Sequence, residues 1–271
     1  MRRIIHLSDI HFGTADHAVV DRAITKINSL EPHLVVVSGD LTQRARTKEF
    51  REARGFLDQL PKPQIVVPGN HDIPLHNVYS RLFKALDKFR KFITEDLTPT
   101  YIDDEIAVVG INSARSLTIK GGRINSEQTE YIRSKMAGLS KEMLKIIVTH
   151  HPFDLPEGFK DNDILGRAAE AMPRIAECGG NVFLSGHLHV SNIDTTAKRY
   201  KLANGHVALI VQAGTAFSDR VRGEAHSFNV LEFESPDLRV ERYECLTAAS
   251  GFEAAQHKNY LQNDHGWERV R

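Results

Sequence analysis

The segment Val182-Phe183-Leu184-Ser185-Gly186-His187-Leu188-His189 is the part of the sequence that best indicates how the chain folds. Its first three residues form a short apolar run of the kind found in buried strands. Two histidines one residue apart, directly after such a strand, are rarely there for packing. We therefore expect His187 and His189 to be functional side chains at the end of a strand.

Four other polar clusters hold the same position relative to an apolar run. They are Asp9-Ile10-His11 after residues 3–7, Gly39-Asp40 after 34–37, Gly69-Asn70-His71-Asp72 after 64–67, and His150-His151 after 145–148. In sheets of buried strands, ligands bind outside the carboxyl ends of the strands. Strand ends that carry Asp, His and Asn but no thiol predict a metal site, which we interpret as a site for two ions.

The composition bounds the class of protein. The chain has 271 residues, of which 41% are hydrophobic, and a formal net charge of +0, so no global charge favours a nucleic acid or an anionic membrane. Cys178 and Cys245 exclude a disulfide framework and a thiolate zinc site, and they fit a reducing compartment. The first strand begins near Met1, which leaves no room for a signal peptide, and no apolar run could cross a bilayer. We expect a cytoplasmic protein.

Periodicity predicts strands that alternate with helices as far as the GHLH cluster, and strands alone after it. Helices are predicted from Asp16 to before Pro32, and over residues 47–60, 77–94, 125–139 and 164–178. Further strands are predicted over residues 106–111, 207–212, 227–233 and 238–245. This order predicts an α/β (α+β) fold, a four-layer sandwich of two packed sheets flanked by helices. We expect one domain over residues 1–247 and a C-terminal tail of uncertain structure over 248–271.

The spacing of the polar residues fits metal binding. Side chains at positions i and i+2 of an extended backbone point to the same side, so Asp9 and His11 could hold one ion. Asp40 could bridge two ions through its two oxygens, and Gly39 and Gly69 permit close approach beside the site. Imidazole, carboxylate and amide ligands suit iron, manganese or zinc. Two such ions ~3.5–4 Å apart favour in-line displacement at phosphorus, with a shared hydroxide as the nucleophile.

The ordered set of motifs resembles the calcineurin-like metallophosphoesterase superfamily. The pattern of that superfamily is D-x-H, GD, GNH followed by D or E, a lone H, and GH-x-H, which stand here as DIH, GD, GNHD, VTHHP and GHLH. The resemblance implies one metal held by Asp9, His11 and His189, a second held by Asn70, His150 and His187, a bridging Asp40, and a His71 that binds phosphate and protonates the leaving alkoxide. It also implies a two-sheet sandwich flanked by helices.

Three further segments narrow the resemblance. IIHLSDIHFG, GNHDIP and GTAFSDRVRGEAHSFN look like the branch that holds class III cyclic-nucleotide phosphodiesterases. This implies hydrolysis of a small phosphodiester, with a 3′,5′-cyclic nucleotide as one candidate. His71 counts against the lipid A pathway pyrophosphatases, which carry arginine at that position. A phosphomonoesterase, a nuclease and a non-catalytic metal-binding scaffold stay open as alternatives, as does the oligomeric state.

Several other residues have weaker assignments. Arg220 and Arg222 follow a strand expected near the metals, and a guanidinium binds phosphate oxygens bidentately, so both are candidate substrate contacts. Asn112 follows the strand predicted over residues 106–111 and is a third candidate. Adjacent side chains on a strand point to opposite sides, so only one of His150 and His151 can face the metals. The motif favours His150.

Overall fold

Two β-sheets organise the chain. The computed structural model describes residues 1–75, 78–196, 199–200, 202, 205–220, 223–247 and 249–270. One sheet contains, in spatial order, β13 (Gly266–Val270), β12 (Glu253–Asn263), β11 (Asp237–Cys245), β10 (His226–Glu234), β1 (Arg2–Leu7), β2 (Leu34–Ser38) and β3 (Gln64–Val67). The other contains β4 (Thr100–Ile102), β5 (Ile106–Gly110), β6 (Leu144–Val148), β7 (Val182–Ser185), β9 (Leu209–Gln212) and β8 (Asn192–Thr195).

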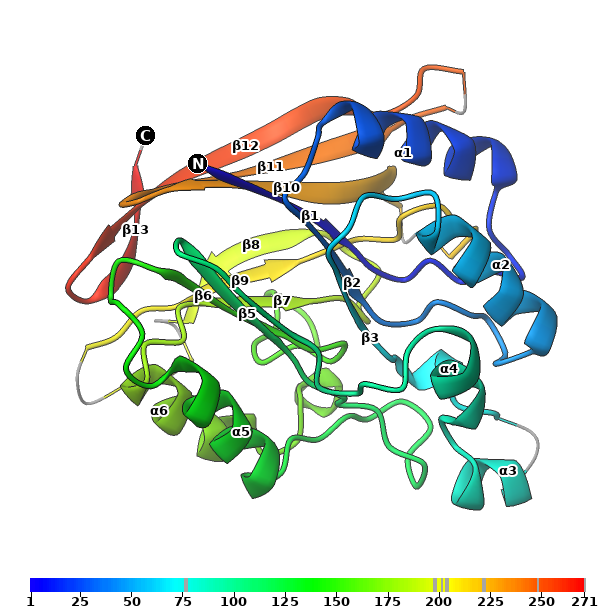
Figure 1. Cartoon of the computed structure of the whole chain (residues 1–271), viewed down its shortest axis with the longest axis horizontal. Helices are drawn as coiled ribbons and strands as arrows, with labels where there is room; N and C mark the ends of the chain where they lie inside the picture. Colours follow the sequence, from blue (N-terminus) through cyan, green and yellow to red (C-terminus); the bar gives the residue numbers. More distant parts are fainter. Residues whose placement is uncertain are drawn as a thin grey trace.

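The central strands are buried on both faces, which explains their continuous apolar runs. Ile4, Val36 and Ile146 belong to the core between the two sheets. On the outer side of the seven-stranded sheet, apolar residues pack with α1 (His17–Ser29) and α2 (Thr47–Leu57), and α5 (Ser126–Met136) and α6 (Ala168–Glu177) pack against the six-stranded sheet. Figure 1 shows the helices on the outer sides of the two sheets. The predicted four-layer sandwich is confirmed.

Two helices begin at the residues that the sequence indicates. The side chain of Asp16 accepts a hydrogen bond of 2.9 Å from the amide of Ala18 at the start of α1. At the start of α5, the side chains and amides of Asn125 and Gln128 bond reciprocally, at 2.8 and 3.0 Å. Both arrangements satisfy amides that have no partner within the helix.

The single helix predicted over residues 77–94 is wrong. The described part of this segment forms two short helices, α3 (Val78–Phe83) and α4 (Asp87–Phe92). Phe89 of α4 is buried in the core, whereas Val78, Leu82 and Phe83 of α3 are exposed. Apolar residues therefore recur at helical spacing through the whole segment, although only its second half packs against the core. Asn77 lies outside the described residues.

The sequence left residues 248–271 without an assigned structure, and the described residues 249–270 contain β12 and β13, which extend the seven-stranded sheet. Tyr260 and Trp267 bury their rings between the sheets. These strands lack the apolar alternation that indicates a half-buried strand, because polar residues occupy most of both faces. No helix in the described part of the chain is long and apolar enough to span a bilayer.

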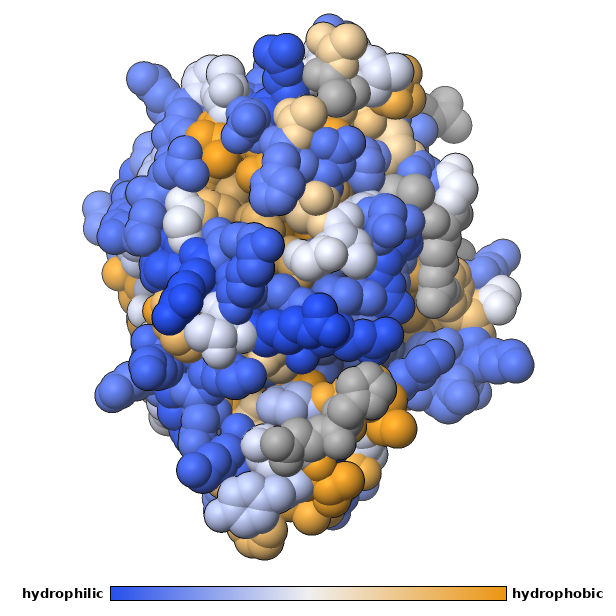
Figure 2. All heavy atoms as spheres, turned by 90° about the vertical axis from the view of Figure 1, so that its right-hand side faces the viewer, coloured by the Kyte–Doolittle hydropathy of each residue, from blue (hydrophilic) through white to orange (hydrophobic). Residues whose placement is uncertain are grey.

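The loops after β1, β2, β3, β6 and β7 meet at one end of the sandwich. Neighbouring strands β1, β2 and β3 are parallel, as are β5, β6, β7 and β9, so their carboxyl ends lie on the same edge of each sheet. Figure 2 views the molecule from the side on which α2, α3 and α4 lie. Hydrophilic residues fill the middle of this face, and hydrophobic residues lie above and below them.

Candidate metal centre

Asp9, His11 and His189 form the first cluster of the centre. Asp9 Oδ1 lies 3.7 Å from His11 Nε2 and 3.6 Å from His189 Nε2, and all three side chains are buried. Asp9 and His11 follow β1, whereas His189 follows β7 of the other sheet. The loops at the ends of the two sheets thus bring together residues that lie 178 and 180 positions apart.

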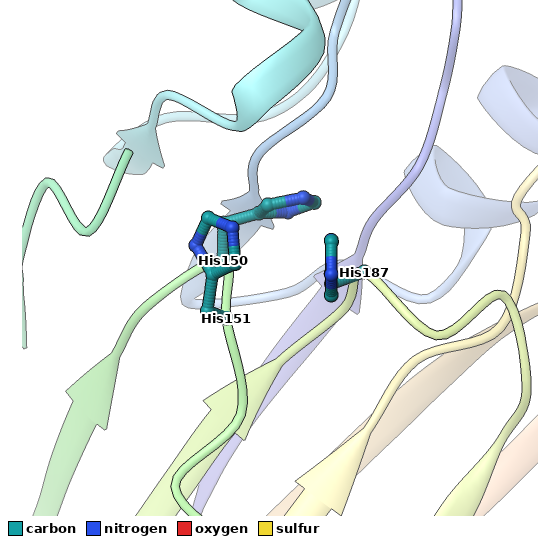
Figure 3. Close-up of side chains that lie close together, drawn as sticks. All are labelled: His150, His151 and His187. Atoms are coloured by element: carbon teal, nitrogen blue, oxygen red, sulfur yellow. The ribbon is translucent and has the colours of Figure 1, made fainter. Parts of the chain in front are cut away.

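Asn70, His150 and His187 form the second cluster. Asn70 Oδ1 lies 3.1 Å from His150 Nε2 and 3.1 Å from His187 Nδ1. Asn70 follows β3, His150 follows β6 and His187 follows β7. Figure 3 shows the rings of His150 and His187 next to each other. An amide oxygen and two imidazole nitrogens converge on one place, which suits a transition-metal ion.

Asp40 connects the two clusters. Its Oδ2 lies 3.7 Å from His11 Nε2 in the first cluster and 3.3 Å from His150 Nε2 in the second. Its Oδ1 accepts a 2.8 Å hydrogen bond from the amide of His71. The carboxylate is buried and held between two groups of ligand-type atoms, the arrangement that a bridging ligand requires.

Unpartnered atoms in the first cluster fit a bound cation. Asp9 Oδ1 and His11 Nε2 are buried and have no hydrogen-bond partner in the described part of the chain. Buried polar atoms normally have partners, because an unpaired one keeps the full cost of losing its water. A metal ion between these atoms would remove that cost. The donor set, with carboxylates, imidazoles and one amide but no thiolate, agrees with iron, manganese or zinc.

Hydrogen bonds fix the orientation of three ligand-type histidines. His150 Nδ1 lies 2.8 Å from the carbonyl oxygen of Ser38, and His11 Nδ1 lies 3.3 Å from that of Thr42. His189 Nδ1 lies 2.9 Å from Thr215 Oγ1. In each case Nε2 is left to face the centre, as is usual for metal-bound histidine. Sequence reasoning did not find these partners, because two of them act through main-chain oxygens and Thr215, although it lies in the GTAFSDRVRGEAHSFN segment, had no role assigned to it.

His151 lies beside the second cluster, but both of its ring nitrogens already have partners. Its ring is 4.5 Å from that of His187, and the two residues are close together in Figure 3. Nδ1 lies 2.9 Å from Ser113 Oγ, and Nε2 donates to the carbonyl oxygen of Lys120 at 2.7 Å. Burial lowers the pKa of His151 well below its usual range, so the ring is neutral. We therefore interpret His151 as a support for the centre.

The extended backbone that we expected at Asp9 and His11 is not what the structure shows. In the described part of the chain, Asp9, His11, Asp40, His187 and His189 all have positive φ, between 48° and 72°. This left-handed conformation is uncommon outside glycine and is often found at functional sites. The same pairs of residues meet, but through tight turns after the strands. Gly186 permits one of these turns, because a Cβ there would lie 1.7 Å from Ser8 Oγ.

The charges of the centre balance one another. Burial alone would raise the pKa of Asp40, but the charge of His150 and its hydrogen bond hold that pKa well below its usual range. Burial alone would lower the pKa of His150, but the charge of Asp40 and its hydrogen bond raise it to about 9. Burial lowers the pKa of His187 to about 3 and that of His189 to about 4, so both are neutral and ready to bind a metal at pH 7.

His71 lies at the edge of the centre, with Arg220 beside it. The two rings of His71 and His11 meet edge to face, 4.8 Å apart. His71 Nδ1 donates to the carbonyl oxygen of Gln43 at 2.9 Å, and Arg220 Nη1 donates to His71 Nε2 at 2.8 Å. Arg220 also donates to Gln43 Oε1 at 3.3 Å. Burial lowers the pKa of His71, and Arg220 adds to this effect.

Of the other two candidate substrate residues, the structure describes only Asn112. The side chain of Asn112 accepts a 3.0 Å hydrogen bond from the amide of Ala114, so it closes a turn in its own loop. The neighbouring residue, Ser113, is the one that contacts His151. Arg222 lies outside the described residues.

Comparison with known proteins shows the family. The model of the calcineurin-like phosphoesterase family matches residues 2–191, the segment that contains every cluster described above. The chain belongs to the calcineurin-like phosphoesterase family. Its likeness to a purple acid phosphatase from yellow lupin (Lupinus luteus) seeds, with a TM-score of 0.67 at 12% identity over 94% of this chain and 53% of that chain, shows the shared fold.

Several curated relatives of this calcineurin-like phosphoesterase are named as phosphodiesterases. A glycerophosphodiester phosphodiesterase of Enterobacter lignolyticus is 35% identical over 80 residues, which are 26% of this chain and 29% of that protein. A probable cyclic nucleotide phosphodiesterase of Xenorhabdus bovienii is 24% identical over 255 residues, which are 88% of this chain and 98% of that protein. The chain spans about half the length of several other curated relatives that it matches.

Replacing Thr215 in this family member should weaken the first metal position without unfolding the chain. Thr215→Val removes the hydroxyl that orients His189, and the loss of such a partner typically lowers metal affinity about 10–100-fold. Thr215→Ser, which keeps the hydroxyl, should bind metal as the wild type does. Competition with a chelator measures both affinities. Equal affinity in the valine and serine variants would show that the contact does not orient His189.

Metal binding should release a proton from His150. A histidine must be neutral to bind a metal, whereas the raised pKa of about 9 leaves His150 charged at pH 7 in the metal-free protein. Affinity should therefore rise with pH, by at most about tenfold per unit, and level off above pH 9. Calorimetric titration with manganese in buffers of different ionisation enthalpy counts the protons released. An affinity that is constant from pH 7 to pH 9 would contradict this charge state.

Proposed function

We propose that the chain hydrolyses a phosphodiester at a centre of two metal ions, and that 3′,5′-cyclic nucleotides are among its substrates. The observation that carries the proposal is the position of Asp40, whose Oδ2 lies within 3.7 Å of a nitrogen from each of the two clusters. Paired ions held this way suit in-line displacement at phosphorus. The names of the Enterobacter and Xenorhabdus relatives support a diester as the substrate.

We assign the two ion positions as follows. Asp9, His11 and His189 would hold one ion, Asn70, His150 and His187 would hold the other, and Asp40 would be shared by the two. Iron, manganese and zinc are the candidates, because each accepts imidazole and carboxylate ligands. When bound, the two ions would withdraw charge from the phosphoryl group and lower the pKa of a water molecule toward ~7, so that it can act as the nucleophile.

His71 is our candidate for the proton donor to the leaving alkoxide. Its Nδ1 is occupied by the carbonyl oxygen of Gln43, so Nε2 is the atom that could carry the proton to the substrate. Arg220 now lies against Nε2, and its guanidinium is suited to two phosphate oxygens. We propose that Arg220 binds the phosphate and leaves Nε2 to face the leaving group. The low pKa of His71 makes its neutral form prevail, so the protonated form should become scarcer, and this step slower, as pH rises.

A substrate panel tests the proposal. Protein reconstituted with iron, manganese or zinc is assayed on cyclic nucleotides, glycerophosphodiesters, oligonucleotides and simple phosphomonoesters, and its metal content is measured on the same sample. We expect two metals per chain and faster hydrolysis of small diesters than of monoesters. Faster hydrolysis of monoesters or of oligonucleotides would contradict the proposal that small diesters are the substrates. Protein that holds two metals and cleaves none of these compounds would instead be a binding scaffold.

A further inference from the structure

The inner face of the seven-stranded sheet changes from apolar to basic along its strands β11, β12 and β13. Val240, Tyr260 and Trp267 on this face are buried against the six-stranded sheet. Residues two positions away on the same strand, in either direction, point to the same side. These positions hold Arg242 on β11, Lys258 on β12 and Arg269 on β13. The inner face therefore carries three cations. It would stay apolar if it only packed against the second sheet.

A pocket lies where these three residues pass the edge of the six-stranded sheet. Its volume is about 460 Å³, and β8, the edge strand of that sheet, forms its other wall. Lys258 Nζ donates to the carbonyl oxygen of Ile193 at 2.8 Å, which joins the two walls. In Figure 1, β8 runs beneath β10, β11 and β12. We call the space lined by Arg242, Lys258 and Arg269 the basic pocket.

The charges in the basic pocket are only partly neutralised. Arg242 contacts Glu224, at 3.7 Å, and Glu244, but its Nε is buried and has no hydrogen-bond partner in the described part of the chain. None of the residues that line the pocket is an Asp or a Glu. Burial and the charge of Arg269 both lower the pKa of Lys258, and Asp194 offsets part of this effect. Like charges held close together cost free energy, which a bound anion would recover.

We propose that the basic pocket binds a phosphorylated small molecule of about nucleotide size, at a place separate from the metal centre. Arginine and lysine are the usual partners of phosphate oxygens. The volume lies within the range of ~300–1,000 Å³ that is typical of small-molecule sites and exceeds what a lone phosphate ion fills. Asn192, Asn229 and Gln256 add amide groups that can bond to the rest of the ligand. No lining residue is a candidate metal ligand.

The full chain, freed of metal by a chelator, tests the proposal without reference to any enzymatic activity. Titration calorimetry measures the binding of two probes, inorganic phosphate and AMP, in the metal-free protein. We expect both to bind, with AMP the tighter of the two because it fills more of the pocket. Arg269→Gln should weaken both by about tenfold, the usual effect of losing one hydrogen bond to a charged group. Arg269 is exposed, so its replacement leaves the core intact.

Two control variants separate the basic pocket from other cations. Arg239 lies on β11, three positions before Arg242 and on the opposite face, where it pairs with Glu241 at 2.6 Å. Arg220 lies beside His71 at the metal centre. Arg239→Gln should bind both probes as the wild type does, whereas Arg220→Gln removes only the phosphate binding that Arg220 contributes at the metal centre and should keep the site that Arg269→Gln weakens.

Several results would overturn the proposal. If neither probe binds the metal-free wild type, the three cations serve only to keep other strands from pairing at this edge of the sheet, as inward charges do elsewhere. Binding that Arg220→Gln or Arg239→Gln weakens as much as Arg269→Gln does would place the anion outside the pocket. Phosphate that binds as tightly as AMP would contradict the proposed size of the ligand.

Discussion

Asp40→Ala should lose both metals and all measurable phosphoesterase activity. Asp40 Oδ2 lies within 3.7 Å of a ring nitrogen from each cluster, so removal of this side chain should weaken both ion positions together. Losing even an outer partner of a metal ligand costs up to about 100-fold in affinity, and losing a shared ligand should cost more. Elemental analysis after dialysis, together with turnover of the best diester of the panel, measures the effect.

Asp40→Asn is the matched variant. Its amide oxygen can still accept the hydrogen bond that the amide of His71 donates at 2.8 Å, but it cannot carry the negative charge of a bridging ligand. It should therefore fold as the wild type does and still lose metal. Activity retained in a metal-stripped Asp40 variant would refute the scheme, because hydrolysis would then not depend on the centre.

His71→Ala should keep both metals and lose most of the turnover. His71 contributes no atom to either cluster, while its ring lies 4.8 Å from that of His11 and would be placed to protonate the leaving group. General acid catalysis typically contributes about 10²–10⁴-fold, so kcat should fall by that factor with a poor leaving group. With a nitrophenolate leaving group, which needs no proton, the loss should be much smaller.

Comparison of leaving groups distinguishes a proton donor from a residue that only supports the structure. If His71 only braces the loop that holds Asn70, then His71→Ala would lower metal content and slow all substrates equally. His71→Gln, which keeps a side chain able to meet Gln43 but cannot act as an acid at neutral pH, should behave like the alanine variant in turnover. Recovery of activity with His71→Gln would sink the assignment of His71 as the proton donor.

The sequence predicted the layers of the fold well, because continuous apolar runs identify buried strands and the polar clusters mark their ends. It did not predict β12 and β13, since Lys258 and Arg269 stand on a face where the alternation should be apolar. It also misread residues 77–94, because a helical period does not show whether both halves of a segment reach the core.

The sequence predicted which residues lie together at the strand ends, but not the geometry in which they meet. Asp9 and His11 meet the other ligand-type residues through left-handed turns, and nothing in the pattern of residues distinguishes such turns from extended backbone. The carbonyl oxygens of Ser38 and Thr42, which orient His150 and His11, could not be predicted either, because every residue has a main-chain carbonyl. Gln43 was missed for the same reason.

The origin of the ligand-type residues has a mechanical consequence. Asp9, His11, Asp40 and Asn70 follow strands of one sheet, and His150, His187 and His189 follow strands of the other. Each ion would therefore have ligands from both sheets. The bound metals would then cross-link the two sheets at this end of the sandwich. Loading them should raise the melting temperature as mass action requires, and it should slow hydrogen exchange at the tips of both sheets at once.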